Sequence, residues 1–251
     1  MASLNDILDF CENRIHTNQI ADFPGAENGL QVENNGSVKK IGAAVDAGLV
    51  PFQKAVEAGV DFLIVHHGLF WDPAYPIMGI RYEKYKLCIE NNLAVYGAHL
   101  PLDCHQEIGN NAILAEKLGL KQSEWFLEHE GNPIGLIAEG GIARADLRSR
   151  LNGLFPQGIT SIEKGSEQPQ KVAVLTGSGA SAVGELKAAG VDTLITGELK
   201  QSHFNQDEEA GLNLYLCGHY ATETFGVSAL ASEVAKNFDL DWEFIPTDCP
   251  I

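Results

Sequence analysis

The chain has 251 residues, 45% of them hydrophobic, which is enough to bury one large core or two small ones. Its 17 basic and 34 acidic residues leave a net charge of −17, and a surface of this sign repels phosphate backbones and argues against a nucleic-acid partner. No apolar run is long enough to cross a membrane, and the five cysteines without a C-x-x-C pair are typical of reduced thiols in a cytoplasmic protein. The first residues carry no basic segment before an apolar run, so no signal peptide is expected.

Strands and helices are predicted to alternate along the first half of the chain. In order, they are a helix over 5–14, a strand over 41–45, a helix over 50–58, and strands over 61–65 and 92–97. Gly59 follows the second helix and suits the left-handed position at which many helices end. Alternation of this kind predicts an α/β fold with mostly parallel or mixed sheets covered on both faces.

The second half continues in the same manner. We expect a strand over 131–138, helices over 144–155 and 182–189, a polar linker over 164–170, strands over 172–176, 192–196 and 212–217, and a last helix over 225–236. The prediction is two related α/β domains, residues 1–124 and 125–251. The alternative that the last segment returns to pack on the first domain stays open.

An internal match supports the relation between the two domains. When the chain is shifted by 131 positions, residues 40–68 fall on 171–199 without a gap, and eight of the 29 pairs are identical. With a shift of 120, His99 and Asp103 fall on His219 and Glu223. A shared βαβ pattern explains the apolar matches, but it does not explain the matching histidines and acids. We therefore interpret the match as a duplication.

Histidines and acids cluster where predicted strands end, which is where open α/β sheets collect ligands. His66 and His67 close one strand, where the turning chain lets neighbouring imidazoles point toward two different ions. His219 and Glu223 follow another strand at the i, i+4 spacing that brings side chains to one helix face. The structural alternatives are ordinary loop histidines and an acid favoured by the helix dipole. Asp103 alone could equally be the N-cap of a helix, and its interpretation as a metal ligand rests on its match to Glu223.

The mixture of ligands limits the metal. Imidazoles and carboxylates without thiolates favour Zn, Fe or Mn. Three histidines and two acids exceed what one four-coordinate ion needs and fit two divalent ions that share a carboxylate. Such a pair activates water at neutral pH and stabilises developing negative charge, so the sequence favours hydrolytic chemistry. Cys104 and Cys217 lie near these residues but are interpreted as small buried side chains.

Several segments resemble the Nif-three-like dinuclear-metal proteins, also called GTP cyclohydrolase 1 type 2 homologues. They are Asn28–Val32, Val65–Leu69, His99–Asp103, Leu194–Glu198 and Gly218–Glu223. The resemblance covers essentially the whole chain. It implies two related α/β domains, a ring-shaped homohexamer, and a pair of divalent ions in a cleft between the domains. By this resemblance the metal ligands are His66, His67, Asp103, His219 and Glu223. The family's Thr-Glu-Arg reads Thr-Glu-Thr here, with Thr224 in place of the arginine, which weakens any phosphate-binding role at that position.

Two further residues are candidates for proton transfer. The internal matches pair His99 with His219 and Glu198 with His67, so both His99 and Glu198 are expected near the strand ends. We predict that one of them acts as general acid or base; the alternative is that they orient the metal ligands.

A glycine-rich segment, Thr176–Ser181, lies between a predicted strand and a predicted helix. Its backbone N–H groups are candidates for binding an anion. An ordinary tight turn explains the segment equally, because neither the Walker nor the Rossmann spacing is met.

Three functions are compatible with these residues. The first is a metal-dependent hydrolase of a nucleotide or another small molecule, and the resemblance implies opening of the GTP imidazole ring. The second is a non-catalytic metal carrier or insertase. The third is a hexameric interaction scaffold that metals stabilise. The expected partners are other copies of the chain and a small-molecule substrate, in the cytoplasm.

Overall fold

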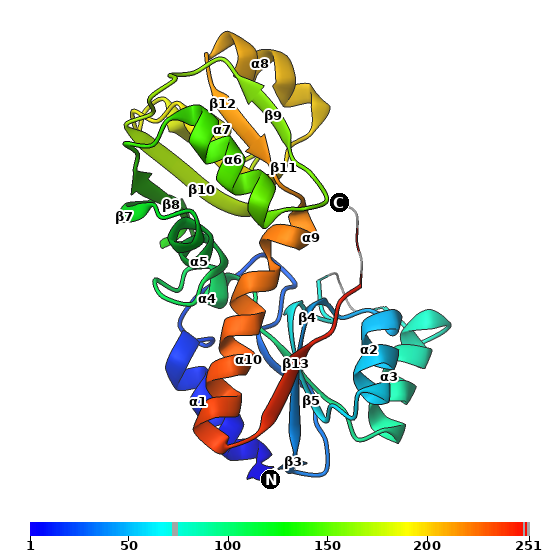
Figure 1. The fold of residues 1–251 in the computed structure, drawn as a ribbon. Helices are drawn as coiled ribbons and strands as arrows, with labels where there is room; N and C mark the ends of the chain where they lie inside the picture. The colour runs from blue at the N-terminus through cyan, green and yellow to red at the C-terminus, as the bar shows by residue number, and fades with distance from the viewer. Residues whose placement is uncertain (72–74, 248, 250–251) are drawn as a thin grey trace. The chain divides into compact units, whose positions relative to one another are not determined.

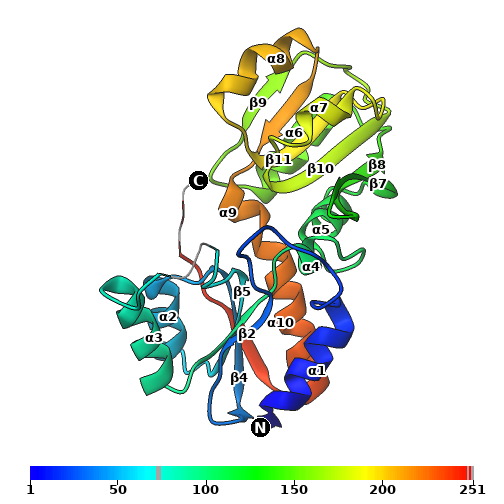
Figure 2. The same ribbon diagram turned by 180° about the vertical axis from the view of Figure 1, so that it is seen from behind.

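The computed structural model describes residues 1–71, 75–247 and 249, which form two compact units. The first unit contains Met1–His105 together with Gly226–Asp248, a segment that holds all but the first two residues of the last helix and the whole of the last strand. The second unit contains Gln106–Phe225. Figures 1 and 2 show each unit as a sheet covered by helices on its two faces, so the predicted α/β class is confirmed. No helix among the described residues is long and apolar enough to cross a membrane.

The first unit is built on a five-stranded sheet. Its order is β13 (Asp241–Phe244), β4 (Lys40–Asp46), β5 (Phe62–His67), β6 (Ala94–Gly97) and β2 (Gly29–Val32). The first four strands are parallel and β2 is antiparallel to β6. A small second sheet pairs β1 (Ala2–Ser3) with β3 (Ser37–Val38). Because β13 pairs with β4, the last segment of the chain belongs to the first unit, the alternative that the sequence left open.

Helices cover both faces of this sheet. Figures 1 and 2 show α1 (Leu4–Ile15) and α10 (Thr224–Phe238) on one face, and α2 (Leu49–Glu57) and α3 (Ile80–Glu90) on the other. Strand side chains alternate between the faces, so Leu63 and Val65 join the core under α2, where Phe52 is fully buried. The same alternation places the buried His66 on the opposite face from Val65. The short α4 (Leu100–Asp103) follows β6.

The second unit has a six-stranded mixed sheet. Its order is β7 (Lys121–His129), β8 (Asn132–Glu139), β10 (Lys171–Ser178), β11 (Thr193–Glu198), β12 (Asn213–Leu216) and β9 (Thr160–Glu163). Strands β10, β11 and β12 are parallel, and the remaining pairs are antiparallel. The parallel centre fits the predicted βαβ pattern. The antiparallel hairpin of β7 and β8 and the edge strand β9 complete the sheet.

Two cores hold this sheet. On one face α5 (Asn110–Lys117) and α6 (Arg144–Leu154) contribute Leu114 and Leu147 to a cluster around Tyr215. On the other face α7 (Val183–Leu186) contributes Leu186 to a cluster with Leu194. The short η1 (Gln201–His203) and α8 (Phe204–Glu209) follow β11, and α9 (His219–Thr222) follows β12. Burial of these apolar faces is the main stabilising term of the unit.

The internal sequence match has a structural counterpart. Gly42 pairs with Leu63 between β4 and β5, and Ala173 pairs with Leu194 between β10 and β11, which is the same register under the shift of 131. Gly59 and Gly190 both adopt a positive φ, of +74° and +67°, directly after a helix or turn. This conformation costs glycine little, so the predicted helix-ending role of Gly59 is confirmed. Gly190 has the same backbone conformation, but it follows turn residues rather than a helix, because α7 ends at Leu186.

Two expectations differ from the structure. The helix expected over 182–189 is regular only over Val183–Leu186, and turns occupy its flanks. Contacts divide the chain after His105 and after Phe225 rather than at 124, because Leu114 of α5 and the following Leu118 and Leu120 pack in the core of the second sheet. The boundary after His105 could not be predicted from hydrophobic periodicity, because a polar loop has none. It follows from the packing of α5, which is a tertiary property.

Candidate metal centre

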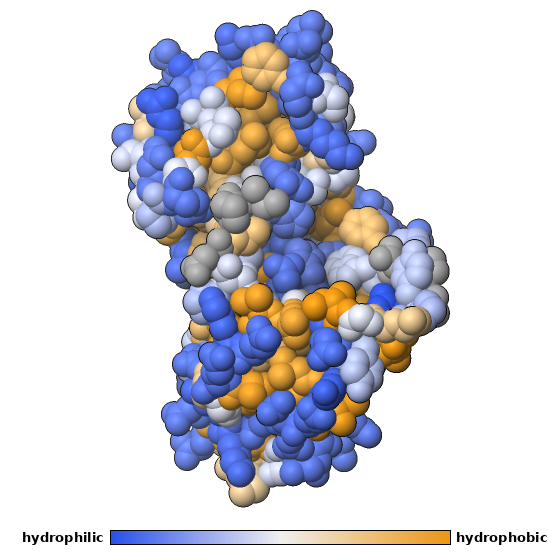
Figure 3. Space-filling view, turned by 90° about the vertical axis from the view of Figure 1, so that its right-hand side faces the viewer, coloured by the Kyte–Doolittle hydropathy of each residue, from blue (hydrophilic) through white to orange (hydrophobic). Residues whose placement is uncertain are grey.

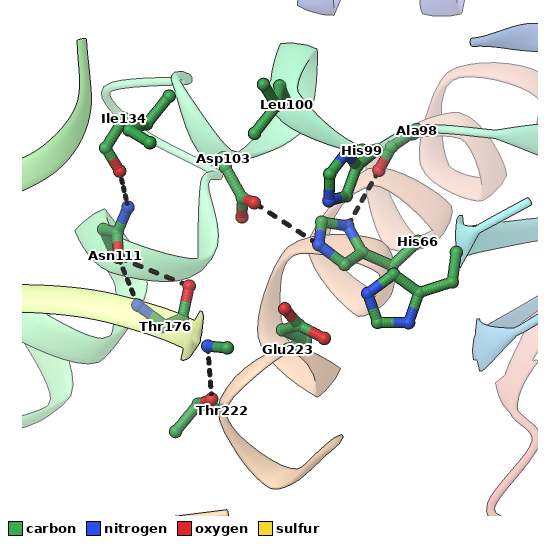
Figure 4. A network of polar contacts seen from close by, with 12 residues as sticks. His66, Ala98, His99, Leu100, Asp103, Asn111, Ile134, Thr176, Thr222 and Glu223 are labelled. Atoms are coloured by element: carbon green, nitrogen blue, oxygen red, sulfur yellow. Dashed lines mark hydrogen bonds and ion pairs between the residues drawn. The ribbon is translucent and has the colours of Figure 1, made fainter. Parts of the chain in front are cut away.

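The end of β5 places His66 and His67 side by side, and a different oxygen atom lies at Nδ1 of each imidazole. Nδ1 of His66 lies 2.9 Å from the carbonyl oxygen of Ala98, and Nδ1 of His67 lies 2.8 Å from a carboxylate oxygen of Asp46. An acceptor at Nδ1 fixes the proton there and makes Nε2 the nitrogen that can coordinate a metal. His66 is fully buried, so its orientation is also fixed by packing. Figure 4 shows His66 with its bond to Ala98.

His99 has the same kind of anchor. Its Nδ1 lies 2.8 Å from Oδ1 of Asp22, and Asp22 also accepts hydrogen bonds from the Asn28 side chain and the backbone N–H of Leu100. Ligand nitrogens of the three histidines at positions 66, 67 and 99 lie within 4.8 Å of one another. Sequence reasoning gave His99 a role in proton transfer; the structure places it among the groups that fit a metal ion.

Asp103 adds an oxygen to this group. It lies at the end of α4, and its Oδ2 is 3.3 Å from Nε2 of His66 (Figure 4). The carboxylate is nearly buried beside the imidazole. The first unit therefore assembles four of the residues that the sequence singled out, His66, His67, His99 and Asp103. Nitrogen and oxygen donors with no thiolate among them form a set that suits Zn, Fe or Mn.

The second unit assembles the other three. Nδ1 of His219 lies 3.0 Å from Glu198, and Nε2 lies 3.2 Å from Glu223. The i, i+4 spacing does bring the two side chains together, but not in the first turn of one helix as predicted: α9 begins at His219 and ends at Thr222, and Glu223 caps its C-terminus. The hydrogen bond with Glu223 raises the pKa of His219 to about 9, with a smaller contribution from Glu198, although burial opposes it. A metal ion at this imidazole must displace the proton.

Gly177 makes room for this pair, a role that the sequence reasoning missed. The residue adopts φ +66°, and a Cβ at this position would lie 2.3 Å from Oε1 of Glu223 and 3.2 Å from Nε2 of His219. Its N–H donates to Oγ1 of Thr222, at 3.0 Å (Figure 4). The glycine therefore allows the backbone at the end of β10 to pass directly against the two candidate ligands.

Three backbone N–H groups of Thr176–Ser181 have partners within the fold, which argues against the anion-binding hypothesis. The N–H of Thr176 donates to Asn111, that of Gly177 to Thr222, and that of Gly179 to the carbonyl of Glu198. The following helix, α7, has only four residues. The alternative of a tight turn is correct, because backbone donors satisfied within the fold are not available to a phosphate.

The cysteines near the candidate ligands behave as expected of buried side chains. Burial raises the pKa of both Cys104 and Cys217 to about 12, which opposes the thiolate form that metals require. Their exclusion from the ligand set is consistent with this environment.

The comparisons with known proteins place the chain in a family. A model of the Duf34/NIF3 (NGG1p interacting factor 3) family matches residues 2–250. The chain belongs to this family. A relative from Archaeoglobus fulgidus, named GTP cyclohydrolase 1 type 2 homolog, is 36% identical over 250 residues, covering 98% of this chain and 99% of its own. One from Deinococcus radiodurans with the same name is 40% identical over 222 residues, covering 87% and 84%.

Solved structures agree with this assignment to the DUF34/NIF3 family. A Thermus thermophilus protein matches with a TM-score of 0.85 at 37% identity, over 99% of this chain and 100% of its own. Reduced HcgD from Methanocaldococcus jannaschii matches with a TM-score of 0.85 at 28% identity, over 97% and 98%. The predicted family and fold class are thus confirmed, and the family resemblance extends over both units.

Replacing Asp22 by Asn tests the anchor of His99. Burial raises the pKa of Asp22, but hydrogen bonds from His99, Asn28 and the backbone outweigh it and lower the pKa to about 2. A lowered pKa stabilises the fold above the unfolded value near 4, and this contribution disappears as the pH falls toward 2. We expect the variant to lose about 2 kcal/mol at pH 7 and to show a flatter acid-unfolding profile between pH 4 and 2. Chemical denaturation across this range is the measurement; equal losses at pH 2 and pH 7 would contradict the assignment.

Trp71 provides an optical test of the histidine cluster. Its ring packs edge-on against His99, with centroids 4.7 Å apart, and against His67 at 5.5 Å. An open-shell ion such as Co²⁺ bound at these imidazoles is expected to quench Trp71 fluorescence. Trp71→Phe should remove most of the quenching, whereas Trp242→Phe, on the edge strand β13, should leave it in place. Quenching that survives in the Trp71 variant would place the ion elsewhere.

Proposed function

We propose that the chain binds two divalent metal ions through His66, His67, Asp103, His219 and Glu223, and uses them to hydrolyse a small molecule. The observation that carries the proposal is the set of histidines at positions 66, 67 and 99, each with an oxygen acceptor at Nδ1. Anchors of this kind orient metal-binding imidazoles and increase their basicity. His219 and Glu223 in the second unit, for which Gly177 makes room, supply the remaining ligands.

Bound divalent ions would supply activated water and stabilisation of negative charge in such a site. The chain's own residues supply proton transfer. Glu198 lies at Nδ1 of His219 and its side chain is half exposed, so it can exchange a proton with solvent. His99 is paired with the nearly buried Asp22, which holds its orientation more tightly. Glu198 is therefore the better candidate for the general acid or base. His99 is the better candidate for a residue that orients a metal ligand or binds the metal itself.

The test begins with elemental analysis of the purified protein and continues with hydrolysis of nucleotides and phosphoesters in the presence of Zn²⁺, Mn²⁺ or Fe²⁺. We expect two ions per chain and turnover of at least one substrate class. Glu198→Gln should lower turnover while metal content is maintained. Stoichiometric metal binding with release to an acceptor and no turnover would instead identify a metal carrier.

We also propose that copies of the chain associate, as the predicted homohexamer requires. The segment that leads into α3 exposes large apolar side chains, and α3 adds more: Tyr75, Ile77, Met78, Ile80, Tyr82 and Ile89. Figure 3 shows apolar residues gathered on this side of the first unit. Exposed patches of this kind mark protein contacts. Ile80→Glu is expected to shift the mass measured by light scattering toward that of a monomer, whereas an exposed polar control such as Gln168→Glu should not.

A further inference from the structure

A cavity of about 430 Å³ lies in the second unit beside Glu198 and His219. Its walls come from the segment between α6 and β9 and from the carboxyl ends of β11 and β12. Figures 1 and 2 show these segments at the same end of the second sheet. Open parallel sheets bind ligands at this end, and the volume lies within the usual range for small-molecule sites.

The ionisable side chains that line the cavity are Glu198 and His219. Both ring nitrogens of His219 are already paired with carboxylates, Nδ1 with Glu198 at 3.0 Å and Nε2 with Glu223 at 3.2 Å. Glu198 contributes a carboxylate, and Gln157, Thr160 and the backbone contribute neutral polar groups. Nε2 of Gln157 donates to the carbonyl of Cys217, at 3.2 Å, which fixes the amide at the wall. Leu199 and Leu216 supply apolar surface. No Lys or Arg is present among the described residues that line the cavity.

This composition is unfavourable for a phosphate. A phosphate needs arginine, lysine or unsatisfied backbone N–H groups, and it would lie here beside the Glu198 carboxylate. The N-terminus of α9 gives little compensation, because α9 has four residues. The net charge of −17 repels a polyanion further.

We propose that this cavity binds the nitrogen-rich ring of a neutral or cationic small molecule, such as an aminoheterocycle, and discriminates against ligands that carry phosphate. N–H donors on the ring would pair with Glu198, and the ring faces would lie against the apolar walls. The proposal rests on the proposed function only in naming this ligand as the substrate of the metal centre. Binding itself depends on residues of the second unit alone.

The experiment compares guanosine with GTP, which share a base and differ in phosphate. Each is titrated calorimetrically into the full-length chain after chelation, with residual metal measured beforehand. We expect guanosine to bind at least about tenfold more tightly than GTP. Glu198→Gln should weaken guanosine binding roughly 10- to 100-fold, the range for a hydrogen bond to a charged group.

Thr160 offers a matched pair of variants, because neighbouring strand residues point to opposite faces of the sheet. Thr160→Arg places a cation at the cavity and should reverse the preference in favour of GTP. Ser161→Arg adds the same charge on the other face of β9 and should leave the preference unchanged. Equal or tighter binding of GTP by the unmodified chain, no binding of guanosine, or equal behaviour of the two arginine variants would overturn the proposal.

The two proposals fail in different ways. If the chain carries no stoichiometric metal but binds guanosine as expected, the proposed hydrolase is wrong and the cavity assignment stands. If metal binds and guanosine does not, the cavity assignment is wrong and the metal centre stands.

Discussion

His66→Ala is expected to remove metal from the protein, with a loss of affinity greater than the 10- to 100-fold typical of changes to residues that only orient a ligand. His66 is fully buried, its Nδ1 is anchored by Ala98, and its Nε2 lies beside Asp103. Alanine leaves the carboxylate without its imidazole partner and removes a nitrogen donor. Elemental analysis after dialysis against a weak chelator measures the loss.

The companion variant His219→Ala tests whether the two units serve one centre. If the ions are shared, each variant should lose the same ions, and the double variant should lose little more. If each unit held its own ion, the losses would add. His203→Ala is a suitable control, because His203 is not one of the candidate ligands in either unit and its Nδ1 lies 3.2 Å from the carbonyl oxygen of Lys200. Full metal content in both the His66 and His219 variants would refute the proposed dinuclear site.

Gly177→Ala is expected to have the second large effect. A positive φ costs a residue with a Cβ roughly 1–2 kcal/mol, and the added carbon would overlap the Glu223 carboxylate, at 2.3 Å. Either the backbone or the carboxylate must move, and both movements disturb His219. We therefore expect lower stability together with weaker metal binding, measured by thermal unfolding with and without added Zn²⁺.

Gly184→Ala is the matched control for this prediction. Gly184 lies in α7 of the same unit, its φ is not positive, and an added Cβ would meet nothing within 4 Å. Alanine in a helix should stabilise the protein by roughly 0.5–1 kcal/mol and leave metal binding unchanged. If Gly177→Ala retained full metal affinity with only the stability loss, the glycine would have a purely structural role.

Local patterns were sufficient to predict much of the fold. Apolar runs bounded by glycines identified β4, β5, β10 and β11, since hydrophobic periodicity and turn chemistry are encoded residue by residue. His66, His67, His219 and Glu223 were selected because histidines and acids at the ends of such runs are candidate metal ligands. In contrast, the helix α3, the strands β7 and β9 and the boundary near His105 were missed. Their sequences carry weak or mixed periodicity, and packing against the rest of the unit stabilises them.

The functional residues that were missed share one property. Asp22, Asp46 and Gly177 are distant in sequence from the groups that they contact, and single carboxylates or glycines carry no signal of their own. Gly177 was noticed only as part of a glycine-rich segment, for which an anion site and an ordinary tight turn were the alternatives. The positive φ and the close approach of Glu223 could be found only in the folded chain, because they depend on the end of β10 lying against the C-terminal end of α9.

By itself, the sequence determined the α/β class, the repeated strand pattern, the acidic surface and the types of residue available to bind metal, since these follow from composition and short-range periodicity. Tertiary structure decided which acceptor anchors each histidine, which glycine makes room for Glu223, and that the final strand returns to pair with β4. These outcomes depend on contacts between residues far apart in the chain. Such contacts form only in the native packing, which the folded chain adopts because it is more stable than competing compact arrangements.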